Sequence, residues 1–189
     1  MKHLLAIIIA MLHLMTAAQT FMLTPQGLVN ADDQSKTYVV VEIPGTQVEL
    51  YTKAKTAVTS MWNSPKDAMS SDEPNIIVVN GYSPNAAHLK KWGRDNVFGM
   101  EYRLQIQFKD GRIRIDAPAI GRLDYANGQG TMLIEAGDNS ISQHITRAFE
   151  KNGKVRFPDF NKNVEDYFNG LVATLIDKMK NGVSNDEDW

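Results

Sequence analysis

The chain of 189 residues contains no cysteine, and only two of its four histidines, His88 and His144, lie beyond residue 18. Without thiols there can be no disulfide bond, thiolate metal site, redox motif or cysteine nucleophile. Two histidines are too few for a histidine-rich zinc centre. The sequence therefore predicts a fold stabilised by its hydrophobic core, with no metal site and no cofactor.

The chain also lacks an excess of positive charge. It has 20 Lys and Arg against 22 Asp and Glu, which gives a formal net charge of -2. Proteins that bind nucleic acid generally need a basic excess to displace the counterions of the phosphates. We therefore expect no nucleic-acid partner. The clusters Asp32-Asp33 and Asp186-Glu187-Asp188 lack the spacing of a calcium loop and are interpreted as solvated.

The most informative feature that is present is an N-terminal apolar run. Lys2 and His3 precede the apolar residues 4–15, and Thr16-Ala17-Ala18 follow. This three-part layout predicts a secretory signal peptide over residues 1–18, cleaved after Ala18. A membrane anchor is the alternative, but it needs about 20 apolar residues. We expect an exported protein, periplasmic or extracellular, with no stable membrane insertion after cleavage; because no cysteine follows the cut, it would not be a lipoprotein.

After that cleavage about 170 residues remain, which is enough for one domain with a sizeable core. Residues 19–36 are polar and are predicted to form a flexible linker. We expect a single α+β domain over residues 37–182 and an acidic tail over residues 183–189.

The first predicted elements are a strand and a helix. Residues 38–43 are rich in β-branched side chains and stop at Pro44-Gly45, which is typical of a strand. Thr46 and Glu49 then have the spacing of a capping box. Apolar residues recur at helical spacing from there to Met61, so we expect an amphipathic helix of about four turns.

Two runs of alternating polarity, 98–109 and 112–120, are joined by Asp110-Gly111, a favoured two-residue hairpin turn. Pairing Lys109 with Arg112 places the apolar side chains of both runs on one face. The opposing pairs are then Phe108 with Ile113, Ile106 with Ile115 and Leu104 with Ala117. The other face receives Arg103, Gln105, Gln107, Arg112, Arg114 and Asp116. This alternation predicts an antiparallel sheet with one buried and one solvated face.

The remaining segments give weaker patterns. They predict a loop over residues 63–74, a buried strand over 76–82, a short helix over 83–93, a strand over 131–135, a short helix over 140–149 and a long helix over 164–179.

The order of these elements resembles a known family. Val40-Val41-Glu42-Ile43-Pro44-Gly45, followed by a helix with Glu49-Leu50-Tyr51, is similar to secreted proteins of Gram-negative anaerobes that form a domain of unknown function. Their fold is like that of the TATA-box-binding protein (TBP-like). The resemblance covers residues 37–124 and implies a curved antiparallel sheet with helices packed on one face. Residues 83–96 and the C-terminal helical extension, residues 125–182, depart from it. The family supplies no catalytic residues, and DNA binding does not follow from a fold.

Residues 83–96 hold the strongest candidate for ligand binding. His88, Lys91, Trp92 and Arg94 combine an imidazole, two cations and an indole on one segment. Such a set can hold an anionic or sugar-like ligand by stacking and hydrogen bonding. The alternative is that Trp92 anchors the segment while the cations are solvated or stabilise the end of the helix.

A second candidate lies on the polar face of the hairpin. Arg103 and Arg114 carry forked guanidinium donors that suit a carboxylate. Charge pairing across an ordinary solvated sheet explains the same residues. The aromatic residues Tyr82, Trp62 and Tyr125 are interpreted as lying at the rim of the core.

A Ser/His/Asp set could be assembled from His88 or His144 and one of many serines, but the strand–Gly-x-Ser-x-Gly–helix context of a serine hydrolase is missing. The leading hypothesis is a non-enzymatic binding domain of the cell envelope, with an anionic ligand, a glycan or an envelope protein as partner. A small hydrolase or isomerase using His88 with a carboxylate is one alternative, and a purely structural envelope protein is another. A concave site that gathers His88 and a carboxylate would favour the enzyme.

Overall fold

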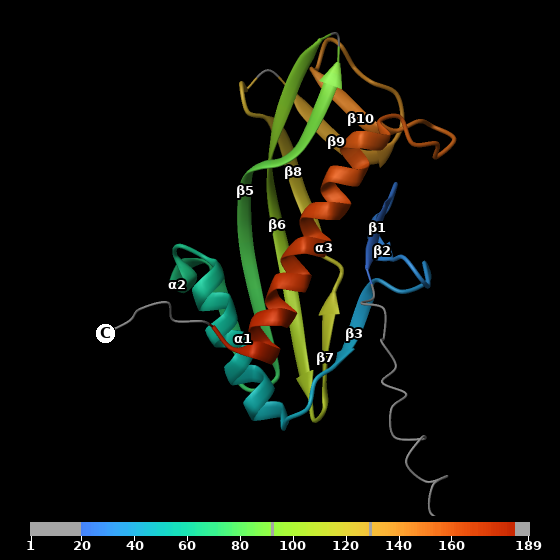
Figure 1. The fold of residues 1–189 in the computed structure, drawn as a ribbon. Coiled ribbons are helices and arrows are strands. Elements are labelled where there is room, and N and C mark those ends of the chain that lie inside the picture. Colours follow the sequence, from blue (N-terminus) through green and yellow to red (C-terminus); the bar gives the residue numbers. More distant parts are fainter. Residues whose placement is uncertain (1–19, 92, 129, 184–189) are drawn as a thin grey trace, which may run out of the picture.

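A computed structural model describes residues 20–91, 93–128 and 130–183 (Figure 1). The elements in chain order are β1 (Phe21–Thr24), β2 (Gly27–Asn30), β3 (Tyr38–Glu42), α1 (Gln47–Met61), α2 (Pro65–Ala68), β4 (Met69–Asp72), β5 (Ile76–Lys91), β6 (Arg94–Lys109), β7 (Arg112–Asp116), β8 (Ala119–Tyr125), β9 (Thr131–Ala136), β10 (Ile145–Phe149) and α3 (Pro158–Asn181). The predicted signal peptide lies outside the described residues, as does nearly all of the predicted acidic tail. Within the described ranges, no helix is long and apolar enough to cross a membrane.

The sheet forks at β6, a strand of 16 residues. In the described part of the chain, eight strands join in the order β10-β9-β8-β6-β5-β4, and β7 and β3 branch from β6. The middle of β6, residues 98–103, pairs with β8, and its last four residues pair with β7 on the same side. The sheet therefore has an upper branch, β8-β9-β10, and a lower branch, β7-β3 (Figure 1). The pairing of β9 with β10 is parallel.

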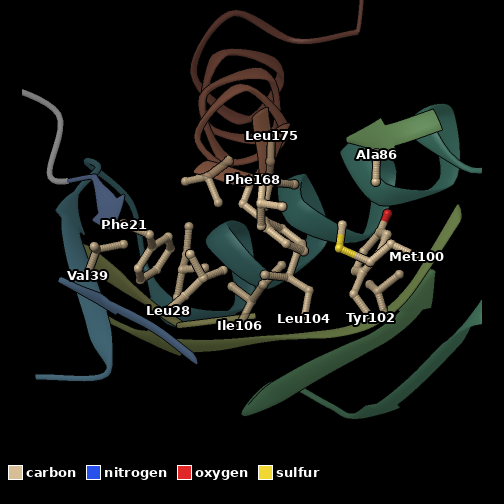
Figure 2. Packing of buried hydrophobic residues seen from close by; sticks show 14 of the residues in the cluster. Phe21, Leu28, Val39, Ala86, Met100, Tyr102, Leu104, Ile106, Phe168 and Leu175 are labelled. Carbon is tan, nitrogen blue, oxygen red and sulfur yellow. The ribbon is translucent and has the colours of Figure 1, made fainter. Parts of the chain in front are cut away.

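Helices α1 and α3 cover one face of the curved sheet, and the opposite face stays open. Alternate residues of the strands, among them Leu104 and Ile106, point toward Phe168 and Leu175 of α3 (Figure 2). These four side chains are fully buried. The fold is thus α+β, with a mostly antiparallel sheet that carries its helices on one side (Figure 1), as the sequence predicted.

The local predictions around the hairpin are confirmed. Lys109 pairs with Arg112, and the two neighbouring apolar pairs follow in the predicted register. The pairing ends before the predicted contact of Leu104 with Ala117. At the start of α1 the capping box is formed, since the Thr46 amide donates to Glu49 Oε2 at 2.7 Å and the Glu49 amide donates to Thr46 Oγ1 at 3.3 Å.

The predicted flexible linker over residues 19–36 is wrong for most of its length, because β1 and β2 form a hairpin there. Phe21, Leu23 and Leu28 are buried in the core. The outer edge of β1 is closed by α3: Asn169 accepts from the Phe21 amide at 2.8 Å, and its own side-chain amide donates to the Phe21 carbonyl at 3.0 Å. The partners are 148 residues apart, so nothing local in the sequence reveals them.

Two predicted short helices are also wrong. Residues 83–91 of the first segment continue β5 and form, with β6, a long ribbon whose turn includes Gly93. Pro84, which suggested a helix start, lies in a bulge between Ser83 and Ala87. The end of the 140–149 segment is strand β10. Helices this short are marginal alone, so pairing with a neighbouring strand prevails. Residues 63–74, predicted as a loop, contain α2 and β4.

Candidate functional site

The predicted ligand-binding residues do not form one site. Lys91 and Arg94 pair at the tip of the β5–β6 ribbon, Arg103 lies at its middle, and Arg114 lies on β7 near the other end. From Val97, the partner of His88, to the residue that pairs with Arg114 is ten positions of β6, or roughly 33 Å of strand. Trp92 lies outside the described residues.

At the tip of the ribbon His88 meets a carboxylate. His88 Nδ1 lies 3.2 Å from Asp95 Oδ2, and both side chains are nearly half exposed. The His88 amide donates to Asn163 Oδ1 at 3.0 Å, which fastens this part of β5 to α3. With nearly half of each side chain exposed, the pair lies open to solvent. The pair therefore lacks the enclosure that a catalytic histidine needs to exclude water.

Arg103 lies on the open face beside Tyr82, in a hollow of about 530 Å³. Tyr82 is 65% exposed, so it is not the rim-of-core residue that the sequence suggested. Its hydroxyl lies over Gly99, where a Cβ atom would come within 2.4 Å. Trp62 and Tyr125, by contrast, pack against the core as predicted.

Arg114 belongs to a polar network at the lower end of the open face. Its Nε donates to Asp116 Oδ1 at 2.6 Å, and its guanidinium lies 4.0 Å above the ring of Tyr38. The side-chain amides of Gln105 and Gln107 donate to Asp116 Oδ2 at 2.8 and 3.0 Å. Because Asp116 neutralises Arg114, this arginine is held in place and adds little net charge.

Beside this network lies a cleft of about 550 Å³, called the basic cleft below. Its lining residues are Tyr38, Val40, Gln47, Asn75, Ile76, Gln107, Phe108, Lys109, Arg112, Ile113 and Arg114. They include three cations and three side-chain amides, and no carboxylate. The cleft lies where α1 begins and where the β6–β7 hairpin turns.

Two of the cations in the basic cleft, Lys109 and Arg112, form no ion pair with a described residue. Lys109 and Arg112 are direct cross-strand partners. Like charges in that position repel and destabilise the pairing. Among the described residues no carboxylate lies within ion-pairing distance of either, although Glu42 is the strand partner of Arg112 on its other side. The cleft therefore carries net positive charge, in an arrangement that the fold alone does not require.

The rim of the basic cleft is fixed by hydrogen bonds. Gln47 Nε2 donates to Asn75 Oδ1 at 3.2 Å and to the Phe108 carbonyl at 3.1 Å. The main-chain N–H of Gln47 donates to Asp110 Oδ1 at 2.7 Å, and this bond joins the start of α1 to the hairpin turn. Sequence reasoning identified Arg114 but missed Gln47 and Asn75, because a helix start and a turn bring them there from outside the hairpin. Lys109 and Arg112 flanking Asp-Gly were a usable signal.

Another hollow, of about 770 Å³, lies beside β8 and β9. Its polar groups satisfy one another: Arg122 Nε donates to Asp124 Oδ1 at 2.6 Å, and Thr131 Oγ1 donates to the same oxygen at 2.8 Å. This leaves less unpaired charge than the basic cleft has. No group of three or more His, Asp or Glu side chains suited to a metal ion is found within the described ranges.

Comparison with known proteins bears on the fold. The sequence matches no protein-family profile and no curated protein. The crystal structure of a TBP-like protein from Parabacteroides distasonis is similar, with a TM-score of 0.52 and 17% identity over 76% of this chain and 91% of that one. A DUF4468 family protein from Bacteroides ovatus aligns with a TM-score of 0.48 and 11% identity, over 79% of this chain and 87% of that one. The protein has a TBP-like fold.

Proposed function

We propose that the protein is an exported, non-enzymatic binding domain of the cell envelope whose basic cleft takes the anionic group of a ligand. The observation that carries this proposal is the unpaired cross-strand pair of Lys109 and Arg112 in a cleft without a lining carboxylate. A bound carboxylate or phosphate would replace the repulsion between them by charge-assisted hydrogen bonds. At about 550 Å³ the cleft has the size of a small-molecule site.

The chemistry of the lining favours an acidic sugar or a phosphorylated group. Amide side chains of Gln47, Asn75 and Gln107 stand beside the cations, and amides both donate to and accept from hydroxyl groups. Tyr38 adds an aromatic wall under the Arg114 guanidinium. An acidic oligosaccharide presents carboxylates, hydroxyls and apolar ring faces together, so it is the ligand class that we would test first.

The test compares a trimer of galacturonic acid with its methyl ester, which has the same shape without the charge. Calorimetry should show binding of the acid and at least a roughly tenfold loss with the ester. The double variant Lys109→Gln and Arg112→Gln should lose this binding, whereas Lys90→Gln at the ribbon tip should retain it. Binding of the acid should weaken as salt is added. Equal binding of acid and ester, or unchanged binding by the double variant, would overturn the proposal.

Export is part of the proposal and rests on the signal-like residues 1–18. Strand β1 begins at Phe21, so cleavage after Ala18 would leave the described fold intact. Intact-mass measurement on protein from the envelope fraction should give a chain that begins near Gln19. A mature chain that retains residues 1–18 would refute cleavage and support the membrane-anchor alternative.

The contact between His88 and Asp95 is the one observation that favours the alternative hydrolase or isomerase. The exposed position of both side chains opposes it, because a general base works best in a protected site. His88→Ala should therefore leave anion binding unchanged. A structural envelope role would instead predict that neither the cleft variants nor His88→Ala alter any ligand binding.

A further inference from the structure

One edge of β5 is open over four residues. β4 pairs with β5 only from Ile76 to Val79. Further along β5, the bulge that contains Pro84 interrupts the strand after Ser83. Over Asn80–Ser83, no described residue pairs with β5 on the side away from β6. An uncovered edge presents unmet main-chain donors and acceptors, and proteins usually protect such edges with charged side chains. Asn80–Ser83 contains no charged residue.

A hollow of about 380 Å³ adjoins this open edge. Its walls come from Trp62 at the end of α1, from Tyr167 and Leu171 of α3, and from Tyr102 of β6. None of its lining residues is acidic or basic. The lining also includes the polar side chains of Asn63, Ser64 and Asn80. A hollow with aromatic walls and polar groups at its rim suits one large aromatic side chain that carries a polar group, such as tryptophan.

Gly81 makes room for the Tyr102 ring, which forms one wall of the hollow. The Tyr102 ring lies over this glycine, where a Cβ atom would meet the ring at 2.2 Å. Tyr102 thereby reaches past β5, and its hydroxyl accepts from the Tyr167 hydroxyl at 3.2 Å. The open strand edge and the aromatic hollow thus adjoin at Gly81, because this glycine belongs to the open stretch and also makes room for the Tyr102 ring.

We infer that this edge binds an extended peptide segment of a partner protein, which pairs as an added strand with Asn80–Ser83 and places one bulky aromatic side chain in the hollow. Strand addition draws affinity from main-chain hydrogen bonds and specificity from a side-chain pocket. The occupant is an extended peptide because the open edge repeats donors and acceptors at strand spacing, which a sugar does not match. The uncharged walls exclude an acidic or basic anchor. This site is separate from the basic cleft and does not depend on it.

The test uses the pentapeptide acetyl-Thr-Val-Trp-Val-Thr-amide and isotope-labelled protein. Nuclear magnetic resonance should show binding with a Kd of about 1 mM or tighter. Shift changes should cluster at Asn80–Ser83 and the hollow, and amide exchange should slow at that edge. The same peptide with alternate amides N-methylated keeps its side chains but cannot pair, so it should bind at least roughly tenfold more weakly. Replacing its tryptophan by aspartate should have a similar effect.

Protein variants provide the matched control. Ser64→Phe fills the hollow and should abolish binding, whereas Thr59→Phe on the exposed side of α1 should not. If Ser64→Phe does not fold, Asn63→Lys adds a charge at the same rim and should also weaken binding. The inference would be overturned if the N-methylated peptide bound equally well, or if the peptide did not bind near 1 mM. It would also be overturned if the shift changes were confined to another surface, or if a neutral methyl glycoside occupied the hollow instead.

Discussion

The lower and upper halves of the sheet are built from the same central strand but by different means. In the lower half, β6, β7 and β3 follow regular alternation, and a two-residue turn sets their register. In the upper half, β5 carries a bulge, the pairing of β6 with β8 shifts register, and β9–β10 is parallel. β6 thus takes part in regular strand pairing in the lower half and in irregular pairing in the upper half.

The comparison shows where function can be placed. The regular half presents fixed side chains on a flat, open face, and the basic cleft lies there. In the irregular half the outer edge of β5 has no strand partner among the described residues from Asn80 onward, and the aromatic hollow lies beside Asn80 and Gly81. Both halves share α3, which crosses the sheet in front of them (Figure 1). Whether they unfold as one unit is the first question to test.

The largest effects should come from truncating one core residue in each half. Phe98 in the upper half is fully buried, with its ring centroid 5.2 Å from that of Phe160 on α3. Phe98→Ala should cost about 3–5 kcal/mol and Leu175→Ala, toward the other end of α3, about 2–5 kcal/mol. Chemical denaturation should show one transition in both variants, because a single core joins the halves.

Separate transitions for near-ultraviolet and far-ultraviolet signals in Phe98→Ala would mean that the upper half unfolds alone. A change below roughly 0.5 kcal/mol for Leu175→Ala would show that this part of α3 does not hold the sheet.

A smaller effect should come from the capping box, a device of the lower half. Thr46→Ala should destabilise the protein by about 1 kcal/mol at neutral pH. Hydrogen bonds from the Thr46 amide and hydroxyl lower the pKa of the Glu49 carboxyl from its ordinary 4.5. That contribution is present above the ordinary pKa and is lost as pH falls through the lower folded value. Urea titrations at several pH values across that range should therefore show that the free energy of unfolding depends less on pH in Thr46→Ala than in the parent protein. An equal pH dependence would contradict the role of Thr46 in stabilising the Glu49 carboxylate.

An effect of similar size should come from Tyr102, where the two halves meet. Burial above all, and then the neighbouring Tyr167 hydroxyl, raise the pKa of Tyr102 well above its ordinary 10.0. The folded state thus favours the neutral phenol, so stability is full below the ordinary pKa and declines as pH rises above it. Tyr102→Phe should lose about 0.5–1.5 kcal/mol at neutral pH and show a weaker alkaline decline. Tyr82 is an exposed tyrosine, so Tyr82→Phe is the control. Its free energy of unfolding, measured by chemical denaturation, should match that of the parent protein at neutral and at alkaline pH.

The parts of the fold that the sequence predicted are those that are local. Thr46 and Glu49 are three residues apart, and Asp110-Gly111 fixes a register that needs no distant partner. The missed hairpin β1–β2 depends on Asn169, and the distal part of β5 depends on β6 and α3. A short segment read alone cannot reveal a partner 75 or 148 residues away.

The candidate sites follow the same division. Arg103 and Arg114 were predictable, because alternation alone assigns them to the open face. The basic cleft was not, since its rim combines α1 with two turns. The aromatic hollow was hidden because Trp62 and Tyr167 come from elements more than a hundred residues apart.

The tie between Phe21 and Asn169 sets an order of events in making the molecule. The first strand leaves the ribosome 148 residues before the helix that completes its hydrogen bonds. At roughly 5–20 residues per second, that interval is about 7–30 s. Throughout it β1 has no partner on α3, and the buried Phe21, Leu23 and Leu28 have no finished core to enter. Because β1 and α3 complete each other's contacts, this part of the core cannot close until α3 has been synthesised.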